Sequence, residues 1–268
     1  MNSNPFALLI LLMAVTRATA ACDVVLAEST FENALIPLDG WQGINNDGGR
    51  EILERVAHPD GAGGFIRLRE DAGDSATMLF LASPKFLGDQ RLAYGGRLVF
   101  RLKQLHTDQL YLGTDVTLES GGIRLNYSFG RFPGTTWEQF EVPLVEGPGW
   151  KRSGQPASQA DFQLVLSSLQ RLTIRGEFSS RQVERTGLDD VRLLAAPPRL
   201  EIHRLPDGRV VVSWARAYGA WQLKASVHLA ADWVAVDAAP IDIEGMLSVT
   251  IPANGPSAFY RLVCPNAP

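Results

Sequence analysis

Short stretches of this chain alternate strictly between apolar and polar residues. Residues 97–103 read RLVFRLK, in which Leu98, Phe100 and Leu102 share one side of an extended chain and the basic residues lie on the other. Residues 123–129, IRLNYSF, repeat the alternation. A period of two predicts β-strands with one face in a core. The same reasoning predicts further strands at residues 24–32, 65–68, 110–118, 137–144, 171–178 and 189–194.

One stretch carries the spacing of an amphipathic helix. After Ser158, the apolar residues Phe162, Val165, Leu166 and Leu169 follow at helical intervals. Ser158 is a helix-capping residue, and an acid three positions later supplies the partner of a capping box. Many strands, one helix and no regular alternation of strands with helices predict an antiparallel β-sandwich.

Four segments occur in the order seen in a known extracellular domain. They are FLGDQRLAYGGRLVFRL at 86–102, the Pro133-Gly134 turn with Trp137 after it, LSSLQRLTIRGEFSS at 166–180 and LDDVRL at 188–193. Together they resemble the laminin IV type A domain over residues 26–195. The resemblance implies an all-β, galactose-binding-like jelly roll related to carbohydrate-binding modules, with an extracellular and non-catalytic role.

Two departures limit what this resemblance implies. Leu79 and Phe80 stand where the family often has an aromatic pair. Two cysteines are too few for the epidermal-growth-factor-like repeats that surround this domain in laminins. A basement-membrane role is therefore not implied.

A second module is predicted after the sequence Ala195-Ala196-Pro197-Pro198. Two prolines end a strand and favour an extended linker. The segments VVVSWARAYGAWQLKAS at 210–226 and AFYRLV at 258–263 resemble small immunoglobulin-like or fibronectin-type-III-like modules of bacterial secreted proteins. We therefore predict a sandwich at 21–195, a linker at 196–199, an immunoglobulin-like β-sandwich at 200–268 and a bacterial source.

The amino-terminal residues carry the pattern of an export signal. Residues 6–15 are apolar, too short a run to span a bilayer, and an Ala-Thr-Ala cleavage motif follows at 18–20, although the preceding residues lack basic charge before the apolar run. We predict a signal peptide at 1–20 and a secreted or periplasmic protein without membrane insertion. Outside the cytoplasm Cys22 and Cys264 favour a disulfide or two free thiols. The alternative is lipid attachment at Cys22, since residues 19–22 loosely resemble a lipoprotein box.

Composition and motifs argue against two function classes. The formal net charge of −4 disfavours nucleic-acid binding, which usually requires a basic face. The four histidines show no metal-binding spacing, and the chain has no G-x-S-x-G motif. Asp189 and Asp190 are neighbours on a predicted strand and should face opposite sides, so they cannot flank one bond. We predict a protein that is not an enzyme.

Binding to an extracellular glycan or a surface protein is the function that we predict instead. Sandwich modules stack aromatic rings on sugars and supply hydrogen bonds from polar side chains. Trp41 and Trp150 lie in glycine-rich loops and are the candidate rings, with a place in the core as the alternative. Arg124 and Asn126 share the polar face of one strand and could line a binding surface or a solvated one.

A structural calcium is the one cofactor that fold analogy suggests. In related sandwiches such an ion joins an early loop to the last strand, for which Asp39 or Asp47 with Asp190 would be the ligands. Two other functions stay open, an assembly role in a bacterial envelope complex and an unrecognised glycan hydrolase. The hydrolase would need acids that converge in a cleft.

Overall fold

The computed structural model describes residues 23–59, 63–70, 76–180, 183–229, 232–252 and 258–264. The predicted signal peptide and Cys22 lie outside these residues. The chain divides into two compact units, Val25–Ala196 and a second that contains Pro197–Pro268. No helix in the described ranges is long and apolar enough to cross a membrane.

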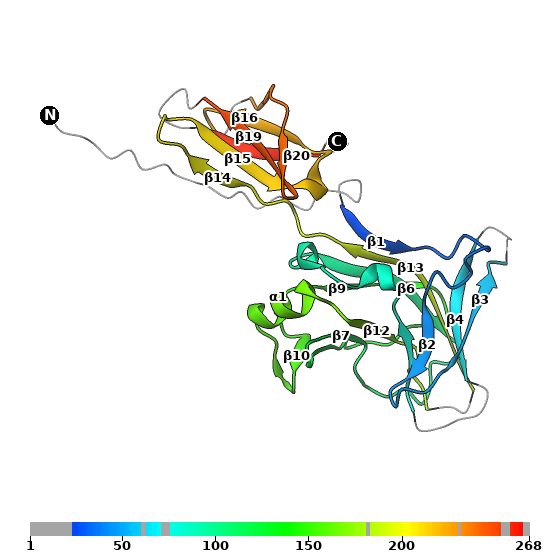
Figure 1. The fold of residues 1–268 in the computed structure, drawn as a ribbon. Coiled ribbons are helices and arrows are strands. Elements are labelled where there is room, and N and C mark those ends of the chain that lie inside the picture. Colours follow the sequence, from blue (N-terminus) through cyan, green and yellow to red (C-terminus); the bar gives the residue numbers. More distant parts are fainter. Residues whose placement is uncertain are drawn as a thin grey trace. The chain divides into compact units, whose positions relative to one another are not determined.

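The first unit contains a six-stranded antiparallel sheet (Figure 1). Its order is β3-β4-β13-β6-β9, and β1 also pairs with β13. The strands are β1 (Val25–Ser29), β3 (Ile52–Ala57), β4 (Gly64–Glu70), β6 (Arg97–Gln104), β9 (Glu138–Pro143) and β13 (Glu184–Leu194). Strands far apart in sequence are thus neighbours, and β13 lies between β4 and β6.

A seven-stranded antiparallel sheet forms the second layer, in the order β11-β10-β8-β7-β12-β5-β2. Its strands are β2 (Gln42–Asn45), β5 (Met78–Leu81), β7 (Val116–Ser120), β8 (Ile123–Tyr127), β10 (Trp150–Arg152), β11 (Gln155–Pro156) and β12 (Arg171–Arg175). Two short 3-10 helices, η2 (Pro84–Phe86) and η3 (Arg91–Ala93), precede β6. The two sheets, with α1 as the α-helix of the described residues, confirm the predicted jelly-roll sandwich.

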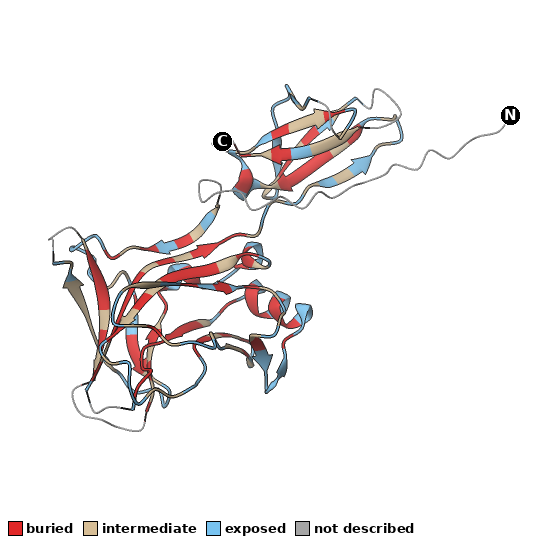
Figure 2. Ribbon diagram, turned by 180° about the vertical axis from the view of Figure 1, so that it is seen from behind, coloured by how far each residue is buried: buried red, intermediate tan, exposed pale blue. Residues whose placement is uncertain are grey.

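The core lies between these sheets, where buried residues run along the strands of both (Figure 2). Leu98, Phe100 and Leu102 are fully buried, which confirms the predicted core face of β6. Helix α1 (Gln159–Ser167) starts at Ser158, and the side chains and backbone N–H groups of Ser158 and Asp161 bond reciprocally in the predicted capping box.

One predicted strand is only half correct. Residues 111–115 form a loop, and Leu112 is 79% exposed, although its spacing predicted a strand from 110 to 118. The loop covers Arg175 of β12, whose guanidinium donates to the Tyr111 carbonyl at 2.8 Å and lies 4.4 Å from the Tyr111 ring centre. Satisfying this buried cation outweighs the local preference for an extended strand.

The second unit is a small β-sandwich with a four-stranded sheet, β14-β15-β19-β18, and a three-stranded sheet, β17-β16-β20. Its elements are β14 (Glu201–Arg204), β15 (Val210–Ala215), the 3-10 helix η4 (Arg216–Tyr218), β16 (Gln222–Ser226), β17 (Val234–Ala235), β18 (Ile241–Ile243), β19 (Met246–Ile251) and β20 (Phe259–Val263). Both sheets contribute buried residues, among them Val212, Leu223 and Val249. Its likeness to immunoglobulin or fibronectin modules stays a prediction.

Candidate binding surface

The two tryptophans predicted to stack on a ligand belong to the core. Trp41 and Trp150 are each 1% exposed. The Trp41 indole N–H donates to Ser29 Oγ at 3.0 Å, and that of Trp150 donates to the Pro143 carbonyl at 2.6 Å. Because their rings are buried and their N–H groups are satisfied, neither offers a face to a sugar. The glycine-rich sequences around them let both side chains point into the core.

Arg124 and Asn126 lie on the outward side of β8, and only Asn126 lines a pocket. Arg124 is exposed and forms an ion pair with Glu119 at 2.9 Å. Asn126 accepts a hydrogen bond from Thr117 at 3.3 Å. The pocket is about 340 Å³ and is lined by Thr114, Asn126, Ser128, Pro148, Gly149, Lys151 and Gly154.

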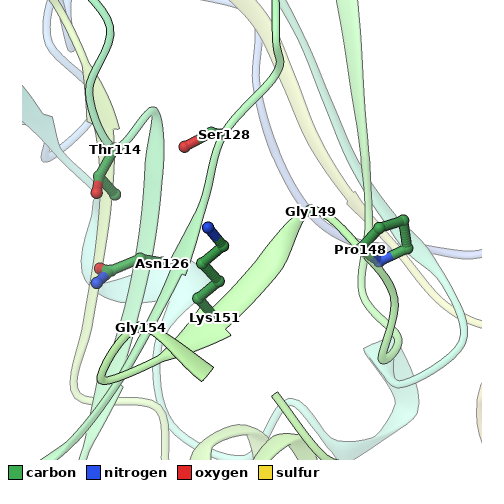
Figure 3. A pocket seen from close by; sticks show the side chains of 7 residues that line it. All are labelled: Thr114, Asn126, Ser128, Pro148, Gly149, Lys151 and Gly154. Atoms are coloured by element: carbon green, nitrogen blue, oxygen red, sulfur yellow. The ribbon is translucent and has the colours of Figure 1, made fainter. Parts of the chain in front are cut away.

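This pocket is polar and has no aromatic wall. Thr114, Asn126 and Ser128 lie on one side and Pro148 on the other, with the Lys151 ammonium pointing between them (Figure 3). Its lining contains no carboxylate or imidazole, so it has no acid–base pair for catalysis. It also lacks a ring on which a sugar could stack.

The predicted calcium ligands do not form a metal site. Asp39 accepts a hydrogen bond from Ser29 at 2.7 Å and pairs with Lys85. Asp190 pairs with Arg101 at 3.4 Å, and Asp47 lies in an exposed turn. No group of three or more His, Cys, Asp or Glu side chains that could hold a metal occurs in the part of the chain that the structure describes. Basic residues therefore neutralise two of these carboxylates.

The predicted disulfide depends on a residue outside the described ranges. Cys264 is buried, 8% exposed, directly after β20. Its proposed partner Cys22 is not among the described residues. The bond stays a prediction.

A different group of side chains gathers on the outer face of the six-stranded sheet, opposite the core. We call it the Trp137 surface, and its members are His58, Phe65, Arg101, Lys103 and Trp137. Phe65 comes from β4, Arg101 and Lys103 from β6, and Trp137 from the residue before β9. His58 follows the end of β3. The sheet order alone brings these four segments together.

Aromatic rings form the centre of the Trp137 surface. The rings of Trp137 and Phe65 meet edge to face, with centres 5.0 Å apart at 82°. His58 lies 5.5 Å from Phe65 and 6.4 Å from Trp137. Beneath them, Gly187 of β13 leaves room, since a Cβ there would lie 2.9 Å from Cη2 of Trp137. Trp137 is half-buried and Phe65 is buried, so Trp137 is the larger ring open to solvent.

Two cations lie over these rings. Lys103 Nζ is 4.3 Å from the centre of Phe65 and 4.5 Å from that of Trp137. The Arg101 guanidinium carbon is 5.5 Å from the centre of Trp137. Such cation–π contacts hold the long side chains in place without using their hydrogen-bond donors. Several donors therefore remain beside the half-buried Trp137 ring.

Asp189 positions the imidazole at one edge of this surface. His58 Nε2 lies 3.5 Å from Asp189 Oδ2, and the backbone N–H of Asp190 donates to Asp189 Oδ1 at 2.8 Å. Burial raises the pKa of Asp189 to about 6, and the carboxylate of Asp190 adds to the rise. Asp189 is only 2% exposed, so its carboxyl group does not reach solvent. Its role at this surface is to hold the His58 ring in place.

A β-bulge corrects the prediction that Asp189 and Asp190 face opposite sides. The pairing of β13 with β6 shifts register between Asp189 and Arg192, and Asp190 adopts a left-handed φ of 49°. Asp190 then pairs with Arg101, the residue directly opposite Asp189 on β6. Strict alternation fails at a bulge because the extra residue reorients the side chains beside it.

The comparisons with known proteins support a laminin domain IV in this chain. Residues 79–206 match the family model described as Laminin B (Domain IV). Human laminin subunit gamma-1 is 31% identical over 180 residues, which cover 63% of this chain and 10% of that protein. Human laminin subunit gamma-2 is 28% identical over 68% of this chain and 15% of that protein. The chain thus spans about a tenth of the length of the first of these relatives.

Two kinds of solved structure are similar at low sequence identity. The L4b domain of human laminin alpha-2 matches with a TM-score of 0.48 and 11% identity, over 64% of this chain and 99% of that chain. The family 11 carbohydrate-binding module of a Clostridium thermocellum cellulosomal cellulase matches with a TM-score of 0.42 and 16% identity, over 64% of this chain and 96% of that chain.

Proposed function

We propose that the first unit is a non-catalytic binding module that recognises an extracellular glycan through the Trp137 surface. The observation that carries this proposal is a half-buried tryptophan with the donors Arg101 and Lys103 beside its ring. Sugars present apolar C–H faces that pack on aromatic rings, and their hydroxyl and acidic groups accept hydrogen bonds from fixed donors. The Trp137 surface supplies both.

The position of the acidic residues supports a binding role over hydrolysis. Burial raises the pKa of Asp115, which pairs with Arg175 in the core. Two further carboxyl groups have pKa values raised by burial, Asp189 to about 6 and Glu184 to about 7. Both belong to β13, where Asp189 faces outward and Glu184, which is fully buried, shares the inner face with Leu188. Two acids on opposite faces of a sheet cannot act together on one glycosidic bond.

The match to laminin domain IV supports a place outside the cytoplasm for this module. The proposal therefore includes removal of residues 1–20 on export, a Cys22–Cys264 disulfide and a linker between the two units. Intact mass spectrometry of the exported protein tests the cleavage and the disulfide together. We expect a chain that begins near residue 21 and gains two hydrogens on reduction, whereas a lipid-sized mass on Cys22 would contradict the disulfide.

A glycan panel with matched tryptophan variants tests the binding function. The exported protein and its Trp137→Ala and Trp233→Ala variants are applied to neutral and acidic polysaccharides. Trp233 is the control because it too is half-buried beneath an arginine, with the Arg261 guanidinium 4.3 Å from its ring centre, but it lies in the second unit. We expect saturable binding to at least one glycan class that weakens roughly 30-fold in Trp137→Ala, the loss of about 2 kcal/mol typical of a central aromatic contact.

Two results would count against the proposal. If the wild-type protein binds no polysaccharide in the panel, glycan recognition is rejected. Binding that is equal in wild-type and Trp137→Ala protein would place the glycan site elsewhere. In the expected result, Trp233→Ala binds as the wild type does.

A further inference from the structure

Lys103 differs from the other charged residues of the Trp137 surface because its ammonium group has no ionic partner in the described part of the chain. Its ammonium group forms no hydrogen bond and no ion pair within the described ranges of the chain, and it lies over two rings. Burial lowers the pKa of Lys103, and the positive charge of Arg67 has the next largest effect in the same direction. A partly desolvated cation without a counter-ion is costly, and an anion placed beside it recovers that cost.

Carboxylates near Lys103 are committed to other partners. Glu54 accepts two hydrogen bonds from Arg67, at 2.7 and 3.0 Å. Asp190 pairs with Arg101 at 3.4 Å, and Asp189 lies against His58 at 3.5 Å. Asp189 raises the pKa of Lys103, so it attracts the ammonium, but no oxygen of it lies within ion-pair distance. The nearby carboxylates thus pair with the basic residues around Lys103, and the N–H groups of the Lys103 ammonium stay available to a ligand.

Strand register places these cations in two adjacent rows. Gly187 of β13 pairs with Arg67 of β4 on one side and with Lys103 of β6 on the other. Arg101 lies one row further, opposite Asp189. Because Gly187 has no side chain, nothing from β13 separates Lys103 from Arg67. The rings of Trp137 and Phe65 occupy the space above Gly187 instead.

We propose that the Trp137 surface recognises an anionic glycan, with a sugar ring packed on Trp137 and a carboxylate or sulfate group bound by the Lys103 ammonium. This inference rests on the proposed glycan function and narrows its ligand class. Uronic acids and sulfate esters share the required chemistry, a delocalised oxyanion next to a sugar ring. Arg101 stands beside the same ring and adds positive potential for either anion.

The test compares polysaccharides that differ only in their charged groups. Polygalacturonate is paired with its methyl ester, and heparin with its desulfated form. Each is titrated into the exported protein by calorimetry at about 50 and about 500 mM NaCl, since added salt screens exposed charge–charge attraction. Lys103→Met removes the charge at similar length. Lys151→Met is the matched control, because Lys151 is an exposed lysine on the other sheet that lines the polar pocket.

We expect the anionic member of at least one pair to bind more tightly, and to weaken about tenfold in Lys103→Met, as for loss of a charge-assisted hydrogen bond. Lys151→Met should match the wild type, and Lys103→Arg should keep most of the affinity. Thermal melting verifies that each variant is folded. If Lys103→Met does not fold, Arg101→Gln is the second variant and should weaken binding of the anionic member in the same way.

Three outcomes would overturn the inference, and they separate it from the glycan function. If both members of each pair bind equally and binding still depends on Trp137, the preference for an anionic glycan is rejected and the glycan function is retained. Undiminished anionic binding by Lys103→Met would reject the assigned residue. No binding to any polysaccharide, in this set or the wider panel, would reject both proposals.

Discussion

Glu184 should make the first unit less stable as the pH rises. It begins β13 and is fully buried. Burial raises the pKa of Glu184 to about 7, with the Ser179 hydroxyl opposing the rise and the carboxylates of Glu177 and Glu70 adding to it. Glu70 is its direct cross-strand partner on β4. Replacement by glutamine keeps the shape and removes the charge.

The size of the effect follows from proton linkage. The pKa of Glu184 rises from 4.5 in the unfolded chain to about 7 in the folded one. Between these values the folded state holds a proton that the unfolded state releases, so stability is lost as pH rises through this window. At 1.36 kcal/mol for each pKa unit, the full rise corresponds to more than roughly 3 kcal/mol, of which roughly 2 to 3 kcal/mol is lost between pH 5 and pH 8.

Urea unfolding at two pH values measures this contribution. The free energy of unfolding of wild-type and Glu184→Gln protein is compared at pH 5 and pH 8, and Glu141→Gln is the control, since Glu141 is exposed on β9 of the same sheet. Relative to the wild type, Glu184→Gln should gain roughly 2 to 3 kcal/mol between pH 5 and pH 8. Using the difference between proteins cancels the similar contribution of Asp189, which both retain.

A difference that does not change with pH would refute this reasoning. It would mean that Glu184 ionises as easily in the folded unit as in the unfolded chain. Glu141→Gln should show that flat behaviour. The two units can unfold separately, so only the transition of the first unit enters the comparison.

Three further predictions concern the packing around the site. Arg175→Met should destabilise the first unit by about 3 kcal/mol in urea unfolding, because it leaves Asp115 buried without its partner; unchanged stability would contradict the assigned ion pair. Gly187→Ala should displace Trp137 and weaken glycan binding several-fold, as measured by titration, since its Cβ would lie 2.9 Å from the Trp137 ring; full affinity would show that the ring adjusts freely. Ser158→Ala should cost about 1 kcal/mol in the same unfolding assay by removing the cap of α1; no loss would mean that the cap is not needed.

Local patterns predicted what local physics decides. The core face of β6 follows from alternation, and the start of α1 follows from its capping residues, because both depend on neighbours within a few positions. The strand predicted at 110–118 is wrong over residues 111–115, because the conformation of this loop depends on its contacts with Arg175, which is far away in sequence. The buried positions of Trp41 and Trp150 depend on packing between the two sheets.

The Trp137 surface could not be found by local reasoning. Its residues come from four segments, and their meeting depends on β13 lying between β4 and β6. The bulge after Asp189 is equally hidden, because Asp-Asp in a strand gives no sign of a register shift. One signal was present in the sequence: Gly187 interrupts a strand otherwise rich in large residues, and a glycine there often marks the close approach of another group.

Nuclear magnetic resonance of the indole N–H groups tests the central claim most directly. The chain has six tryptophans, and a Trp137→Phe spectrum assigns the signal of Trp137. On addition of a glycan found to bind in the panel, we predict that the Trp137 signal shifts with saturation. The signals of Trp41 and Trp150, whose N–H groups donate within the core, should stay in place. A shift confined to the tryptophans of the second unit, with Trp137 unmoved, would contradict the account.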